Sequence, residues 1–133
     1  MRKIVVFGSA AADLTGRSPH LPVPGETVMG SGFGISPGGK GSNQAVAAHR
    51  AGGDVVMVTK LGLDVFGKAV TDFYEAEGMD ISYLFRDESQ DTNLAMILVD
   101  EGTAQNEIVV IGGACTNITE NSATIVPKAA PFA

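Results

Sequence analysis

Residues 37–48 read PGGKGSNQAVAA, a glycine turn that runs directly into an alanine-rich segment. Residues 42–51 contain no helix breaker and are followed by Gly52-Gly53, so the sequence predicts a helix over 42–51. The first amides of a helix have no partner inside it, and glycines let a ligand approach closely. The turn therefore predicts a site for an oxygen-rich or anionic ligand. The alternative is a tight loop with a solvated Lys40.

Two short apolar runs flank this helix. Residues 4–7 (IVVF) and 55–58 (VVMV) predict strands of a parallel sheet, apolar throughout and buried on both faces. Asp64 is a candidate N-cap for a second helix that runs to about Glu77, with Gly78 as its stop. This alternation predicts an α/β fold. Strands of this kind need neighbours along their edges, and an edge left unpaired would imply a longer parent chain, self-association or a complementary subunit.

Two segments break the alternation. Residues 10–37 are rich in Gly, Pro, Ser and Thr, and Pro24-Gly25 suits a type II turn, so we expect short strands and turns there. Residues 94–99 and 108–111 flank a polar, glycine-containing loop and predict a hairpin. We expect both segments to form a small β layer added to the α/β core. A further helix is expected to open near Thr119.

The composition limits the function classes. The 133 residues are 44% apolar and 18% charged, which suits one globular domain. A net charge of −6 and nine scattered Lys and Arg residues argue against a nucleic-acid partner and favour a small molecule. No apolar run approaches the roughly 20 residues of a membrane helix. The single cysteine and the absence of a signal-like start favour a cytoplasmic location, and the two histidines lack metal-ligand spacing.

A nucleotide-binding P-loop is one alternative for the glycine turn. Residues 34–40 fit the first seven positions of the Walker A pattern. That pattern requires Ser or Thr directly after the lysine, where this chain has Gly41. The preceding residues 30–33 (GSGF) also make a poor buried strand. We therefore do not expect a P-loop.

Four segments together resemble the ribokinase members of the PfkB carbohydrate-kinase family. They are Gly8-Ser9 with Asp13, then 24–27 (PGET), then 38–48 (GGKGSNQAVAA), then Gly62, Asp64, Phe66 and Gly67. The resemblance covers nearly the whole chain, but the chain has less than half of that family's usual length. It implies a partial Rossmann-like ribokinase fold with a small β-sheet lid, built from about 10–37 and 92–111, that closes over a sugar.

The resemblance also implies roles for individual residues. The residue matching Asp13 binds sugar hydroxyls, those matching Gly38, Gly39 and Lys40 cradle the sugar, and the one matching Asn43 bonds another hydroxyl. The chemistry agrees, because a carboxylate accepts hydrogen bonds from hydroxyls while Lys and Asn donate them. Without the resemblance, Asp13 is equally a turn residue and Asn43 a helix-terminal residue. The family further implies ATP and Mg²⁺ as cofactors, with sites largely outside this chain, and a homodimer through the lid.

Two departures modify these expectations. Ribokinases commonly carry Asn two residues before the sugar-binding Asp, where this chain has Ala11, so a sugar related to ribose becomes an alternative substrate. The late Gly-Ala-Gly-Asp motif, whose Asp deprotonates the sugar hydroxyl that receives the γ-phosphoryl group of ATP, has no counterpart here. We therefore expect the sugar-binding half of a sugar kinase, inactive by itself. The rival hypothesis is a non-catalytic remnant that binds a sugar or dimerises.

Overall fold

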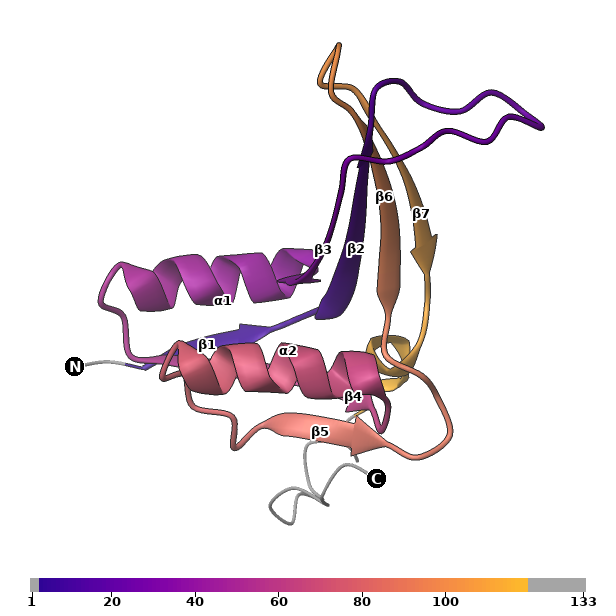
Figure 1. The fold of residues 1–133 in the computed structure, drawn as a ribbon. Helices are drawn as coiled ribbons and strands as arrows, with labels where there is room; N and C mark the ends of the chain where they lie inside the picture. Colours follow the sequence, from indigo (N-terminus) through magenta and orange to yellow (C-terminus); the bar gives the residue numbers. More distant parts are fainter. Residues whose placement is uncertain (1–2, 120–133) are drawn as a thin grey trace.

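The computed structural model describes residues 3–119, which form a helix-covered core and a second, projecting sheet (Figure 1). The core sheet is parallel and has the order β1-β4-β5, with β1 spanning Ile4–Phe7, β4 Val55–Gly62 and β5 Leu84–Asp87. Helices α1 (Lys40–Arg50) and α2 (Val65–Ala76) lie side by side on one face of it (Figure 1). The predicted α/β fold is confirmed.

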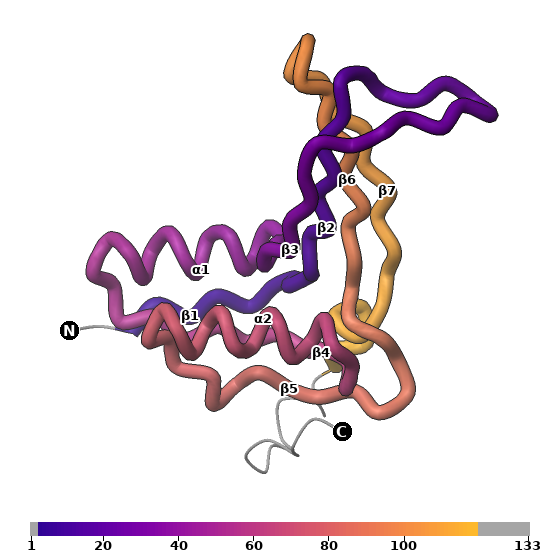
Figure 2. Tube along the Cα trace, in the orientation of Figure 1, coloured from indigo at the N-terminus to yellow at the C-terminus, as the bar shows by residue number. Residues whose placement is uncertain are grey.

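The second sheet has four strands in the order β3-β2-β6-β7. Its strands are β2 (Ala11–Ser18), β3 (Gly32–Gly38), β6 (Leu94–Asp100) and β7 (Asn106–Ile111). Strand β2 pairs antiparallel with β3 and parallel with β6, and β6 pairs antiparallel with β7. The sheet projects from one end of the two helices, and a short 3-10 helix, η1 (Ala114–Asn117), follows it (Figure 2). Both segments expected to form an added β layer supply its strands, and we call it the lid sheet.

The hydrophobic core lies between the helices and the parallel sheet. Alternate residues of β4 point into it, because successive side chains of a strand face opposite sides. Small alanines at the contacts let the helices approach the strands closely. Each large apolar side chain buried there stabilises the fold by about 1.5–3 kcal/mol. The cluster comprises Ala10, Ala12, Ala45, Val55, Met57, Leu61, Val70, Tyr74, Met79 and Leu84.

Local signals in the sequence account for the helix ends and the main turn. Asp64 caps α2 by accepting a hydrogen bond from the amide of Gly67 at 2.7 Å, and Gly78 follows with a φ of 75°. Pro24 and Gly25 form the expected turn, since Gly25 has a φ of 86° and the amide of Glu26 donates to the carbonyl of Val23. Within residues 3–119, no helix has the length and apolar character needed to cross a membrane.

Strand β1 departs from the prediction of burial on both faces. Val5 is 63% exposed and Phe7 is 64% exposed, whereas Val6 packs against the core cluster. The reason is that β1 is an edge strand and that α1 and α2 cover one face of this sheet (Figure 1). The rule that parallel strands are buried on both faces applies to strands covered from both sides. Within the described residues, the outer edges of both β1 and β5 are unpaired.

One strand, β5, was missing from the sequence-based prediction, and one expected helix lies outside the described residues. Strand β5 has four residues and includes Arg86 and Asp87, so it carries neither a continuous apolar run nor clean alternation. Pairing with β4 makes it a strand. The helix expected to open near Thr119 falls outside the described residues.

Candidate functional site

The glycine turn packs directly on the chain between β1 and β2. Gly39 has a φ of 94°, and a Cβ atom there would lie 2.7 Å from the carbonyl oxygen of Ser9. A Cβ atom at Gly41 would lie 2.8 Å from backbone atoms of Gly8 and Ser9. The amide of Ser42 donates to the carbonyl of Ser9 at 2.9 Å. Because backbone meets backbone, this contact holds the start of α1 beside the start of β2.

Asp13 lies against this turn. The register of β2 and β3 places Ser36 opposite Asp13 and Gly38 opposite Ala11. The Asp13 carboxylate contacts the Cα position of Gly38, because a side chain at Gly38 would overlap the carboxylate. Asp13 is half-buried, and this burial raises its pKa. Within residues 3–119 the carboxylate has no hydrogen bond or ion pair, so its acceptor capacity is unused.

Lys40 and Asn43 belong to the first turn of α1. The amide of Asn43 donates to the carbonyl of Gly39 at 2.9 Å, so both side chains start within one turn of the glycines. Neither exposed side chain has a hydrogen bond or ion pair in the described part of the chain. No side chain caps the start of α1, and its first turn has no acidic residue, so the positive end of the helix is not neutralised. Two side chains with unused donors therefore lie in the helical turn that follows Gly38, the residue that the Asp13 carboxylate contacts.

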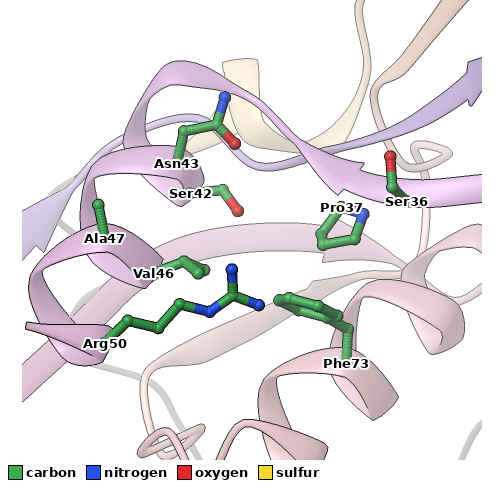
Figure 3. A pocket seen from close by; sticks show the side chains of 8 residues that line it. All are labelled: Ser36, Pro37, Ser42, Asn43, Val46, Ala47, Arg50 and Phe73. Atoms are coloured by element: carbon green, nitrogen blue, oxygen red, sulfur yellow. The ribbon is translucent and has the colours of Figure 1, made fainter.

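A groove of about 350 Å³ lies beside this region, between α1, α2 and β3 (Figure 3). Asn43 lines it, but Asp13, Gly38, Gly39 and Lys40 do not. The groove is already occupied in part by protein contacts: the Arg50 guanidinium lies over the Phe73 ring and donates two hydrogen bonds to the Glu77 carboxylate. The structure thus places Asp13 directly against Gly38, while Asn43 lines this groove. The residues lining the groove are Ser36, Pro37, Ser42, Asn43, Val46, Ala47, Arg50 and Phe73.

The structure adds two residues that the sequence did not single out. Ser36 is the cross-strand neighbour of Asp13 and is exposed on the same face of the sheet. Tyr74 of α2 donates a hydrogen bond to the buried hydroxyl of Ser42 at 2.5 Å, which fixes the first turn of α1. Burial raises the pKa of Tyr74, so the phenol keeps the proton that it donates. The strand period predicts Ser36 only once the register is known, and no sequence signal links Ser42 to Tyr74.

Comparison with known proteins identifies the family. The family model described as pfkB family carbohydrate kinase matches residues 1–131. The chain belongs to this family. It is 44% identical over 119 residues to a ribokinase of Bacillus subtilis, an alignment that covers 90% of this chain and 40% of the relative.

Solved structures agree with the fold. The ribokinase of Giardia lamblia matches with a TM-score of 0.77 and 34% identity over 86% of this chain and 37% of the other. The Arabidopsis thaliana ribokinase complexed with ribose and ATP matches with a TM-score of 0.69 and 32% identity, covering 83% of this chain and 36% of that one. This PfkB-family chain therefore has a partial ribokinase fold, and it spans about 40% of the length of the Bacillus subtilis relative. The sugar-binding roles of Asp13, Gly38, Gly39, Lys40 and Asn43 stay predictions.

The raised pKa of Asp13 predicts a pH-dependent stability cost. The folded chain holds the Asp13 proton to higher pH than the unfolded chain, so stability falls as pH rises from the ordinary value of 3.8 through the folded pKa. Asp13→Asn should therefore stabilise the fold at about pH 7, and this advantage should vanish at about pH 3.5. Urea midpoints of both proteins across that range measure the effect. Asp54→Asn, at an exposed position, controls for the lost charge; an equal gain there would contradict the prediction.

Proposed function

We propose that this chain is the sugar-binding half of an ATP-dependent sugar kinase of the ribokinase type. The kinase transfers the γ-phosphoryl group of ATP to a hydroxyl of ribose or a related sugar. The observation that supports this most is that Asp13, Lys40 and Asn43 have unpaired polar side chains and belong to the two segments that meet at an uncapped helix start. Membership of the PfkB family and the likeness to ribokinases supply the substrate class.

The site has the chemistry that a sugar requires. In this proposal the Asp13 carboxylate accepts hydrogen bonds from neighbouring sugar hydroxyls, while Lys40 and Asn43 donate to sugar oxygens. Asp13 is already partly dehydrated by burial, so its bonds to a ligand replace fewer bonds to water. Ala11 offers no amide to a further hydroxyl. For that reason the proposal names ribose or a related sugar as the ligand.

ATP, when bound, supplies the phosphoryl group, and the described residues do not fit its site. Residues 3–119 contain no group of three or more His, Cys, Asp or Glu side chains placed to hold a metal ion. The glycine-rich helix start within these residues is that of α1, which this proposal assigns to the sugar. As the family resemblance implies, we propose that the ATP and Mg²⁺ sites lie largely outside this chain and that the catalytic base lies outside it. Binding a sugar without a base or phosphate clamp forfeits several orders of magnitude in rate, so the chain alone should be inactive.

One face of the lid sheet carries a row of apolar side chains. Ile35, Leu14, Met96 and Val109 form one row across its four strands, on the face opposite to Asp13. Ile35, Met96 and Val109 are exposed large apolar side chains, as are Phe33 and Leu98 on the same face. A continuous apolar face marks an association site, and two identical faces can pair around a two-fold axis. We infer a homodimer through this face. We also propose a cytoplasmic location, which the single cysteine favours.

Calorimetry of this chain with a panel of pentoses and hexoses tests sugar binding. We expect measurable binding of at least one sugar, and Lys40→Met should weaken it about tenfold or more by removing a charged donor. Lys68→Met removes a comparable exposed lysine, which pairs with Asp72 on α2, and should leave the affinity unchanged. Absence of binding by the unmodified chain, or equal losses in both variants, would contradict the site assignment. A kinase assay on a longer parent chain with the same panel tests the reaction class.

Sedimentation of the purified chain tests the dimer. Met96→Lys places a charge in the centre of the apolar face and should weaken self-association at least about tenfold, because an unpaired charge would be buried. Met29→Lys makes the same change in the exposed loop before β3 and should have no effect. A monomeric unmodified chain, or a Met96→Lys variant that associates as tightly as the unmodified chain, would refute the lid-face dimer. A dimer that binds no sugar would instead favour the rival hypothesis of a dimerising remnant.

A further inference from the structure

The Asp64 carboxylate does more than cap α2. One oxygen, Oδ1, accepts hydrogen bonds from the amide of Gly67 at 2.7 Å and from the hydroxyl of Thr92 at 2.9 Å. The other oxygen, Oδ2, accepts from the amide of Thr92 at 2.7 Å. An N-cap needs one acceptor oxygen, and here both oxygens of the carboxylate also accept from Thr92. Burial alone would raise the pKa of Asp64, but the bonds from Thr92 and Gly67 outweigh it and hold the pKa below its usual value.

Thr92 is seated tightly at the end of the core sheet. It is 2% exposed, and its hydroxyl accepts a hydrogen bond from the amide of Gly62, the last residue of β4, at 3.0 Å. A Cβ atom at Gly62 would lie 2.6 Å from the amide nitrogen of Thr92, and one at Gly67 would lie 2.8 Å from its hydroxyl oxygen. Glycine is therefore needed at both positions for Thr92 to pack this closely.

The neighbours of Thr92 join the other connections between core and lid sheet. The carbonyl of Asp91 accepts from the amide of Ala114, and the side-chain oxygen of Asn93 accepts from the amide of Cys115 at 3.0 Å. The carbonyl of Asn93 accepts from the amide of Ala12 at 2.9 Å, one residue before Asp13. Figure 2 shows the chain passing here from β5, around the start of α2, into β6. Residues 91–93 thus form hydrogen bonds with the start of β2 and with η1, which follows the last strand of the lid sheet. We call residues 91–93 the junction.

We propose that Asp64 is a positioning residue of the sugar site: by anchoring the junction to α2 and β4, it fixes where the lid sheet carries Asp13. The path is short. Asp64 holds Thr92, Asn93 holds Ala12, and β2 then pairs with β6 at Asp13 and Ala95. The positive end of α1 is held separately, through Ser9. This assignment rests on the proposed sugar-binding function, because it concerns how the acceptor and the donors of that site are kept in register.

In the full 133-residue chain, the variant Asp64→Asn separates capping of α2 from the hydrogen bonds to Thr92. Asparagine caps helices about as well as aspartate, so its oxygen can still serve Gly67. Its amide group would then face the amide of Thr92, donor against donor. We expect exchange of the Ala12 and Ala114 amides, which do not contact Asp64, to accelerate about tenfold or more in hydrogen-exchange NMR. The amides of α1 should be unchanged. Sugar affinity measured by calorimetry should fall about tenfold.

Controls separate positioning from a purely local or global effect. Asp72→Asn makes the same change at an exposed site on α2 and should alter neither readout. Thr92→Val removes the hydroxyl but leaves the helix cap intact, and it should accelerate the same junction amides, which keeps the test open if Asp64→Asn does not fold. The proposal would be overturned if amide exchange accelerated only at Gly67 and Thr92, or equally at all amides. Unchanged sugar affinity would also overturn it. If the unmodified chain binds no sugar, the proposed function fails, and the exchange data alone decide whether Asp64 positions β2.

Discussion

The close packing of the glycine turn on the backbone between β1 and β2 is the constraint on which this structure depends. Gly39 and Gly41 leave no room for side chains between the two segments, and the Ser42 amide bonds to Ser9. This contact brings an uncapped, positive helix end next to a strand that carries a half-buried carboxylate. Without it, the unpaired acceptor on β2 and the unpaired donors on α1 would have no fixed relation to each other.

The polar groups of the chain fall into two classes with different consequences. At the junction, the carboxylate of Asp64 and the hydroxyl of Thr92 are fully engaged with one another and with backbone amides. At the site, Asp13, Lys40 and Asn43 have no protein partners within the described residues. A half-buried carboxylate without partners lowers stability, which is a common cost of a binding site. A preorganised site requires this combination: supporting groups whose hydrogen bonds are all made within the protein, next to binding groups whose hydrogen bonds are left for the ligand.

Local signals in the sequence predict much of this fold. The helix after the glycine turn, the Asp64 cap, the Pro24-Gly25 turn and the two segments of the lid sheet follow from breakers, caps and strand patterns. Features that depend on contacts between distant segments do not follow in this way. The exposure of β1 depends on what covers it, β5 depends on pairing with β4, and the bond from Tyr74 to Ser42 joins residues 32 positions apart. The candidate site was found through the family resemblance together with helix-end chemistry, since the sequence alone left Asp13 and Asn43 ambiguous.

The central claim is that Asp13, the glycine turn and the start of α1 bind one sugar molecule. Titrating the isotope-labelled chain with ribose, and following the backbone amide signals by NMR, tests it most directly. The account predicts that the largest shifts appear at Asp13, Gly38, Gly39 and Lys40, and saturate with one common affinity. Shifts centred instead on Val46, Arg50 and Phe73 in the groove between the helices, or no shifts with ribose or any related sugar, would contradict it.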